Sequence, residues 1–328
     1  MTTKEVRDKL AERGKSLGLY SQTVRIEKNP ILQNKVAQGY CAGASLDWLR
    51  LVLHNGNGSA MPGDSMAAAA FLMQTTPRRN AFYDSRKAQL RQARAAKTTQ
   101  LNDAIQQVNE KAQEILNKKL ATPGMTQAQY DQLVEKVEES IEKAVAKLQL
   151  EHQATMSRFD AASSTDALFR QFWLEFAKTL DGTTGQAQYS KLKIAGSSPN
   201  SVYGPPNGLV KAIDAVTSHR GFLPGSGALV GVFPTGAGTG HGVAIHRLNT
   251  GKYQFFDPNF GVFEFDYKNL LWAFVFIFLK AYPAMSDGTP DAGDYQDASG
   301  MVRAEFVIYL GPGLPVPGVN NLRAGLPV

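Results

Sequence analysis

Apolar residues recur with helical spacing in the first half of the chain and with strand-like alternation in much of the second. Leu46, Leu49 and Leu53 share one face of a helix predicted from Cys41 to about Asn55. Residues 1–20 are interpreted as a short amphipathic helix or a loose arm, and further helices are predicted over residues 66–74, 166–180, 209–217 and 269–282. Strands are predicted over residues 228–233, 241–248, 253–257, 260–265 and 301–310, with a loop over residues 182–207. Helices followed by neighbouring strands predict an α+β fold with a C-terminal antiparallel sheet.

A long polar segment with a heptad pattern interrupts this order. Its first helix has apolar residues four and three positions apart, at Leu101, Ile105, Val108, Ala112 and Ile115. A second helix follows a turn, after which Thr126 and Gln129 have the spacing of a capping box. Residues 86–119 contain eight Lys or Arg and three Asp or Glu. Residues 127–153 contain three Lys or Arg and six Asp or Glu. Their opposite charges predict an antiparallel helical hairpin over residues 85–158.

This pattern predicts four parts along the chain. Residues 1–84 form the N-terminal helical part of the core, and residues 85–158 form the inserted hairpin. Residues 159–310 form the rest of the core with its antiparallel sheet, and residues 311–328 form an extended tail rich in Pro and Gly. The hairpin is expected to project from the core, either as an insertion or as an arm for a partner or a second copy.

Composition narrows the range of functions. The chain is 43% hydrophobic and 20% charged, with a net charge of +6, as in ordinary globular proteins. Most of its excess of basic residues lies in residues 86–119, which lack the interleaved aromatic residues of a single-strand nucleic-acid binder, so no nucleic-acid partner is expected. The longest apolar run, residues 270–279, is too short to cross a bilayer, and residues 1–17 have no apolar signal-peptide segment. No cofactor or metal is expected.

Cys41 is the single cysteine of the chain, so it cannot form an intramolecular disulfide. It lies between Gly39 and Gly43 and opens the first core helix, where unpaired backbone N–H groups favour a thiolate. A catalytic thiolate also needs a histidine that the fold brings to it, and a third group that orients this histidine. The alternative interpretation is a buried, inert thiol.

The histidine and its orienting group are predicted from strand parity. Alternation places His241 and Val243 on the same face of their strand. If a three-residue hairpin loop ends with Gly251 in a left-handed conformation, Asp257 lies opposite Val243, and Asn259 lies opposite His241. His241 and Asp257 are then diagonal neighbours on one face, within reach of a hydrogen bond. A two-residue loop would shift the register and separate them. Asn259 is the alternative orienting residue.

Three motifs in this order resemble a known family. They are Gly39-x-Cys41-x-x-x-Ser45-x-x-Trp48, then Gly240-His241, then Asp257-Pro258-Asn259-Phe260-Gly261. Together they resemble the YopT/AvrPphB family of bacterial effector cysteine proteases, which have a papain-like core. The resemblance implies that Cys41 is the nucleophile, His241 the general base and then acid, and Asp257 the orienting carboxylate. It also implies an oxyanion hole that joins the Cys41 backbone N–H to an upstream amide side chain, for which Gln38 and Asn34 are the candidates.

The resemblance implies a thiol protease that cleaves a protein substrate. It further implies synthesis in a bacterial cytoplasm and secretion, without a cleaved signal peptide, into a host or target cell. The same three residues also serve glutamine deamidases and transglutaminases, because the acyl-enzyme chemistry is shared. A non-catalytic binding protein is a third possibility, with the hairpin docking a partner or a secretion chaperone. The hairpin between Cys41 and His241 is longer than the family leads us to expect.

Overall fold

The computed structural model describes most of the chain, namely residues 1–30, 32–33, 40–56, 58–73, 76–121, 123–185, 188–204, 207–234, 240–285, 302–312 and 314. The helices are α1 (Thr3–Ala11), α2 (Gln22–Lys28), α4 (Cys41–Asn55), α5 (Asp64–Met73), α6 (Thr76–Leu120), α7 (Gln127–Ala162), α8 (Thr165–Thr184), α9 (Gly208–Thr217), α10 (Tyr267–Phe276), the π-helical segment η1 (Ile277–Ala281) and α11 (Tyr282–Ala284). The strands are β1 (Lys15–Gly18), β2 (Lys193–Tyr203), β3 (Ser226–Pro234), β4 (His241–Arg247), β5 (Tyr253–Asp257), β6 (Gly261–Phe265) and β7 (Val302–Leu310).

The chain divides into two compact units. The first unit comprises Met1–Asn80 and Phe169–Leu322 and contains the sheet, while the second consists mainly of Ala81–Leu168. In the described part of the first unit, seven strands form one sheet in the order β1-β6-β5-β4-β3-β7-β2, and every neighbouring pair is antiparallel. The predicted combination of helices with an antiparallel sheet is therefore confirmed.

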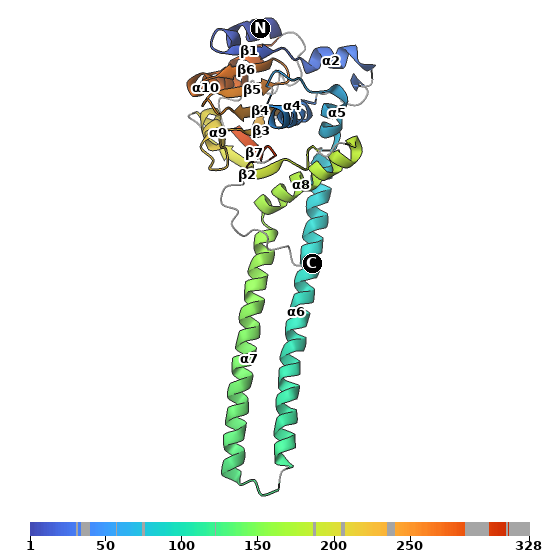
Figure 1. Ribbon diagram of the computed structural model, residues 1–328, viewed down its shortest axis with the longest axis vertical. Coiled ribbons are helices and arrows are strands. Elements are labelled where there is room, and N and C mark those ends of the chain that lie inside the picture. The colour runs from blue at the N-terminus through green and yellow to red at the C-terminus, as the bar shows by residue number, and fades with distance from the viewer. Residues whose placement is uncertain are drawn as a thin grey trace. The chain divides into compact units, whose positions relative to one another are not determined.

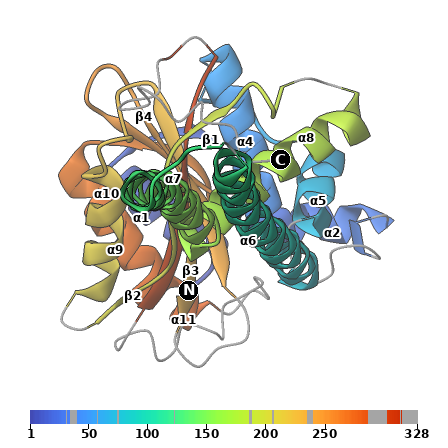
Figure 2. The same cartoon turned by 90° about the horizontal axis from the view of Figure 1, so that it is seen from below.

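Helices cover both faces of this sheet. Helix α4 packs against β3 and β4 on one face, and α9 and α10 lie on the other (Figures 1 and 2). Alternate residues of the central strands, such as Val230, Val243 and Phe255, are fully buried in the core on the α9 and α10 side. On the α4 side, Trp48 stacks on Phe256 with ring centroids 5.4 Å apart. Both faces are covered, so β4 and β5 are buried along almost their whole length.

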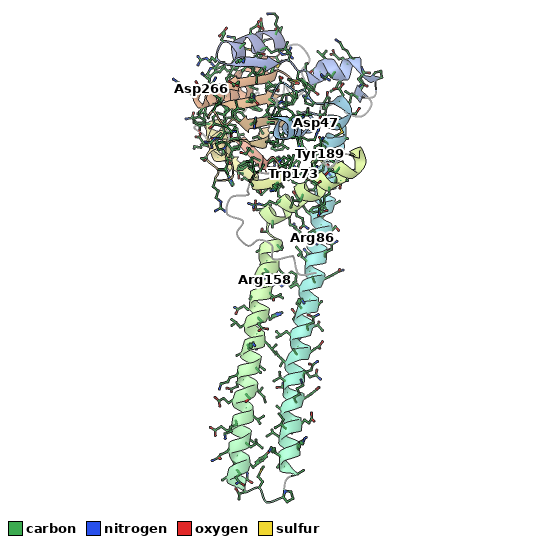
Figure 3. The ribbon with its side chains drawn as sticks, in the orientation of Figure 1. Asp47, Arg86, Arg158, Trp173, Tyr189 and Asp266 are labelled. Atoms are coloured by element: carbon green, nitrogen blue, oxygen red, sulfur yellow. The ribbon has the colours of Figure 1, made fainter. Side chains whose placement is uncertain are left out.

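A buried polar network fixes α4 to its surroundings. Asp47 has no exposed surface, and its carboxylate accepts hydrogen bonds from Arg50 at 2.7 Å and from the Tyr189 hydroxyl at 2.9 Å (Figure 3). The Gly63 N–H donates to the second carboxylate oxygen at 3.0 Å. The charge of Asp47 is thus compensated by Arg50 and two further donors, which a buried carboxylate requires. Helix α4 ends at Asn55, and the next residue, Gly56, caps it in a left-handed conformation with φ of 65°.

The second unit contains the two long helices of the predicted hairpin. Helices α6 and α7 run side by side (Figure 1), and Arg94 of α6 forms an ion pair with Asp160 of α7 at 2.6 Å. The predicted capping box at the start of α7 is confirmed, since Thr126 Oγ1 accepts the Gln129 N–H at 3.3 Å and the Gln129 side chain accepts the Thr126 N–H at 3.0 Å. The apolar seam is covered unevenly, with Ala112 exposed by only 7% and Ile115 by 50%. Both helices extend beyond the predicted limits of residues 85–158.

The prediction was wrong at two edge strands. Residues 15–18 form β1 within the segment expected to be a helix or arm, and β2 occupies much of the predicted loop over residues 182–207. The register of β2 against β7 shifts near Gly196 and again between Ser198 and Ser201. These irregularities accommodate Gly196 and Pro199, which an edge strand tolerates, because β2 pairs on one side only within the described sheet.

The predicted helix over residues 269–282 is interrupted. Helix α10 passes into the π-helical segment η1 and then into the short α11, which begins at Tyr282. The apolar run of residues 270–279 lies in α10 and η1 and is largely buried in the core. Among the helices that the structure describes, none has both the length and the apolar character needed to cross a membrane.

Candidate active site

Cys41 is the first residue of α4, and its side chain is largely buried, with 8% of the residue exposed. The Gly242 N–H donates a hydrogen bond to Cys41 Sγ at 3.3 Å. One turn further along α4, Ser45 Oγ donates to the Gly242 carbonyl at 2.9 Å. The start of α4 is therefore joined at two points to the residue that follows His241, so the sulfur lies beside the His241–Gly242 peptide.

Gly242 makes this approach possible because it has no side chain. A Cβ atom at this position would lie 2.7 Å from Ala42 Cα and 2.9 Å from Ala42 N, well inside van der Waals contact. The glycine that follows the histidine in the sequence thus allows the helix backbone to pack directly on the strand.

The predicted hairpin register is confirmed. Ala244 pairs with Phe256, the Leu248 N–H donates to the Lys252 carbonyl at 2.8 Å, and Gly251 has a φ of 83°. As this register requires, His241 and Asp257 lie close together: His241 Nε2 is 3.3 Å from Asp257 Oδ2, and both side chains are fully buried.

Asn259 does not lie opposite His241 as predicted. Strand β5 ends at Asp257, which pairs with Gly261 across the turn into β6, and Gly261 has a φ of 104°. Asn259 therefore lies within this turn, where its N–H donates to Asp257 Oδ1 at 2.8 Å. Its side-chain amide donates to the hydroxyl of Tyr282 at 2.9 Å. Asn259 thus contacts the Asp257 carboxylate through its backbone and Tyr282 through its side chain.

Tyr282 contacts the His241–Asp257 pair, which the sequence did not reveal. Its hydroxyl lies 2.8 Å from His241 Nε2 and 3.1 and 3.2 Å from the two carboxylate oxygens of Asp257. The residue is fully buried, and its ring lies against the imidazole with centroids 5.0 Å apart. Nothing in the local pattern around position 282 distinguishes this tyrosine from the core aromatics before it.

Gln22 of α2 is a second residue that the sequence did not reveal. Its Oε1 accepts the N–H of Tyr40, the residue immediately before Cys41, at 2.9 Å. Its backbone N–H donates to the Pro258 carbonyl at 2.8 Å, next to Asp257. The residue is fully buried, and its Nε2 has no hydrogen-bond partner within the described structure. The predicted oxyanion candidates Gln38 and Asn34 lie outside the described residues.

A cluster of phenols and charges supports the segment before Cys41. The hydroxyls of Tyr20 and Tyr40 are 3.0 Å apart, and Tyr40 also donates to Asp64 at 3.3 Å. Arg25 forms an ion pair with Asp64 at 2.7 Å. Burial is the main cause that raises the pKa of Tyr40 to about 12, and burial also raises the pKa of Tyr20. Both phenols therefore stay protonated at neutral pH and act as neutral hydrogen-bonding groups.

His246 is separate from this site. It lies on the same strand as His241 but at an odd spacing of five positions, so the two side chains point to opposite faces of the sheet. Its ring nitrogen Nδ1 is 3.1 Å from Gln254 Oε1. Burial lowers the pKa of His246 from its ordinary value, and the Gln254 contact opposes this shift.

Comparison with known proteins agrees with the two downstream motifs, those of His241 and Asp257. Residues 178–289 match the model of peptidase family C58, described as Yersinia/Haemophilus virulence surface antigen. The chain resembles the YopT/AvrPphB family. The matched range of this family includes His241, Asp257 and Tyr282, whereas Cys41 and Gln22 lie before it.

One solved structure with a similar chain is the crystal structure of the Pseudomonas avirulence protein AvrPphB. The two chains share 15% sequence identity with a TM-score of 0.27, and the match covers 57% of this chain and 85% of that one. No curated protein sequence gives a significant match.

Proposed function

We propose that this chain is a cysteine protease with a papain-like core, in which Cys41, His241 and Asp257 act as nucleophile, base and orienting acid. One observation carries the proposal. The N–H of Gly242, which follows His241 of the buried His241–Asp257 pair, donates a hydrogen bond to Cys41 at the N-terminus of α4. Buried acid–histidine pairs beside a thiol are the arrangement that nucleophilic catalysis by cysteine requires. The C58 family match supports proteolysis as the reaction.

The reaction begins when the Cys41 thiolate attacks the carbonyl carbon of a substrate peptide bond. His241 Nε2 is directed at Asp257, so Nδ1 is the nitrogen that takes the thiol proton and later gives it to the leaving amine. The C–N bond breaks, the amine departs protonated, and a thioester with Cys41 remains. Water then attacks the thioester carbonyl and gives its proton to Nδ1. The acid product leaves, and the thiolate is restored.

The oxyanion would be held by the Cys41 backbone N–H and by Gln22 Nε2. The first-turn N–H groups of a helix have no carbonyl partner four residues earlier, and the N-cap residue Tyr40 provides no side-chain cap. Gln22 Nε2 is a buried donor without a partner in the described structure, held one residue from Cys41 through its own Oε1. Buried donors are rarely left unsatisfied unless they serve a ligand or water. Such donors contribute roughly 3–4 kcal/mol each to lowering the barrier.

The substrate is proposed to be a protein of a host or target cell, with the chain acting as a secreted bacterial effector. The support is the family match, whose description refers to virulence. We also propose that the hairpin of α6 and α7 recruits a protein partner such as the substrate or a secretion chaperone. Its length and its partly exposed seam, with Ile115 and Leu150 each at least half exposed, support this role.

The test compares the proteins of target cells exposed to the wild type and to Cys41→Ala. We expect new protein N-termini with the wild type alone, and His241→Ala should match Cys41→Ala, while His246→Ala should match the wild type. Since Cys41 is the single cysteine, intact mass after iodoacetamide treatment reports on this residue only. Alkylation of the folded wild type at neutral pH should be faster than that of the urea-unfolded chain. A conversion of glutamine to glutamate without new N-termini would instead indicate a deamidase, and identical N-termini in both samples would contradict proteolysis.

A further inference from the structure

We infer that His241 is oriented through the hydroxyl of Tyr282, with Asp257 acting behind that hydroxyl; the inference rests on the proposed function. The Tyr282 oxygen is 2.8 Å from His241 Nε2, whereas the nearest Asp257 oxygen is 3.3 Å away. The same hydroxyl is 3.1 and 3.2 Å from the two carboxylate oxygens. A hydroxyl thus stands between the imidazole and the acid, and its contact with the imidazole is the shorter one.

The hydrogen atoms around Tyr282 fix the direction of each bond. Asn259 Nδ2 is a donor only, so it occupies one lone pair of the Tyr282 oxygen. The Asp257 carboxylate accepts hydrogen bonds, and the phenolic proton is directed to it. With that proton engaged, the phenol oxygen can meet His241 Nε2 only as an acceptor, so Nε2 must carry a hydrogen. In neutral His241 the proton therefore lies on Nε2, and Nδ1 is the basic nitrogen available to the thiol.

The fold delivers this hydroxyl through an irregular helix. Phe274, Phe278 and Tyr282 form an aromatic column along α10, η1 and α11, with successive centroids 4.7 and 5.7 Å apart. The π-helical segment η1 lies directly before Tyr282, and such segments are frequent at functional sites. The imidazole also contacts Phe278, with centroids 6.0 Å apart. Because this column, His241 and Asp257 are buried, water cannot easily replace the phenolic oxygen if it is removed.

Two arrangements predict different results for Tyr282→Phe, which removes one oxygen atom. In a direct triad Asp257 itself binds His241, and in the relay the Tyr282 hydroxyl lies between them. In a direct triad, Asp257 continues to hold Nε2–H, and the variant behaves as the wild type does. In the relay, His241 loses the nearer of the two partners Tyr282 and Asp257, and its imidazolium form loses a charge-assisted hydrogen bond. That loss should slow Cys41 alkylation at neutral pH by about ten- to hundredfold. The acid limb of the plot of alkylation rate against pH should also move to higher pH. A less stable imidazolium stabilises the Cys41 thiolate less, so the thiol loses its proton only at higher pH.

The experiment measures Cys41 alkylation by iodoacetamide across the pH range in which histidine titrates, together with ¹⁵N NMR of His241. The matched control is Tyr309→Phe, which removes the hydroxyl of a buried tyrosine in β7, and it should behave as the wild type does. In the wild type the NMR spectrum should show the Nε2–H tautomer. In Tyr282→Phe it should show a mixture that includes the Nδ1–H tautomer.

Unchanged alkylation and an unchanged tautomer in folded Tyr282→Phe would overturn the relay and leave Asp257 as the direct partner. If this variant does not fold, Asn259→Ala takes its place, because it frees the phenol oxygen from one donor. With less competition for that oxygen, the hydrogen bond from His241 Nε2–H should shorten and its proton NMR signal should move downfield, whereas an unchanged signal would overturn the relay. If the wild-type thiol reacts no faster than the unfolded chain, the proposed protease function fails. The tautomer measurement still decides the role of Tyr282 in that case.

Discussion

Replacing Gly242 by alanine should move Cys41 away from the strand that carries His241. The added Cβ atom would lie 2.7 Å from Ala42 Cα, whereas carbon atoms pack best at about 3.5–4.0 Å, so α4 and β4 must move apart by about 0.8 Å. A rigid shift of that size would lengthen the 3.3 Å contact between Gly242 N and Cys41 Sγ to about 4.1 Å, beyond the range of a hydrogen bond to sulfur. Overpacking of this kind costs about 1–3 kcal/mol of stability, which a domain of this size tolerates.

The effect on chemistry should be larger than the effect on stability. Misplacing reacting groups by about 1 Å can lower a rate about a hundredfold. We therefore expect Gly242→Ala to unfold at a slightly lower temperature and to react with iodoacetamide at Cys41 far more slowly than the wild type at neutral pH. Cleavage of the proposed cellular target should fall by about the same factor of a hundred.

Gly231→Ala provides the matched control. Gly231 pairs directly with Gly242 across β3 and β4, but its added Cβ would meet side-chain atoms of Phe233 and Glu305 at 3.1 and 3.2 Å rather than the backbone of α4. Side chains can yield by a few tenths of an ångström, so this variant should keep the alkylation rate of the wild type. Equal rates for wild type and a folded Gly242→Ala would refute the argument that this close approach builds the site.

Two further predictions concern stability. Asp47→Ala should lower the free energy of unfolding by about 3–5 kcal/mol, because it leaves Arg50 buried without its partner, and urea titration should show a smaller loss for Asp47→Asn. Burial lowers the pKa of His246 from 6.5, so below that pH the unfolded chain binds a proton that the folded chain does not. This contribution to stability is complete above the unfolded pKa and is lost as the pH falls through it, by at most about 1.4 kcal/mol per pH unit. In His246→Gln, the urea midpoint should change less between neutral and mildly acidic buffer than it does in the wild type. An equal change in both proteins would contradict this role of His246.

The sequence contains the information for the His241–Asp257 pair because both residues belong to one local hairpin. A three-residue loop ending at Gly251, with strict alternation on both sides, fixes which residues face each other, and the observed register follows it. The prediction for Asn259 failed because β5 ends at Asp257, and Gly261 with its positive φ turns the chain into β6. Parity reasoning holds only while the strand continues, and the Asp257-Pro258-Asn259 motif is itself a turn signal.

Gln22 and Tyr282 could not be predicted in this way, because their roles depend on packing between distant segments. Gln22 lies nineteen positions before Cys41, in a helix whose sequence shows no link to Cys41, and only the fold brings its amide to the Tyr40 N–H. Tyr282 belongs to an apolar helix in which every aromatic residue is expected to be core. A five-residue π-helical segment sets which of them faces His241, and helical periodicity assumes a constant turn. Residues that support a catalytic pair from a neighbouring element should therefore be sought where a regular helix or strand changes its period beside a buried ionisable group.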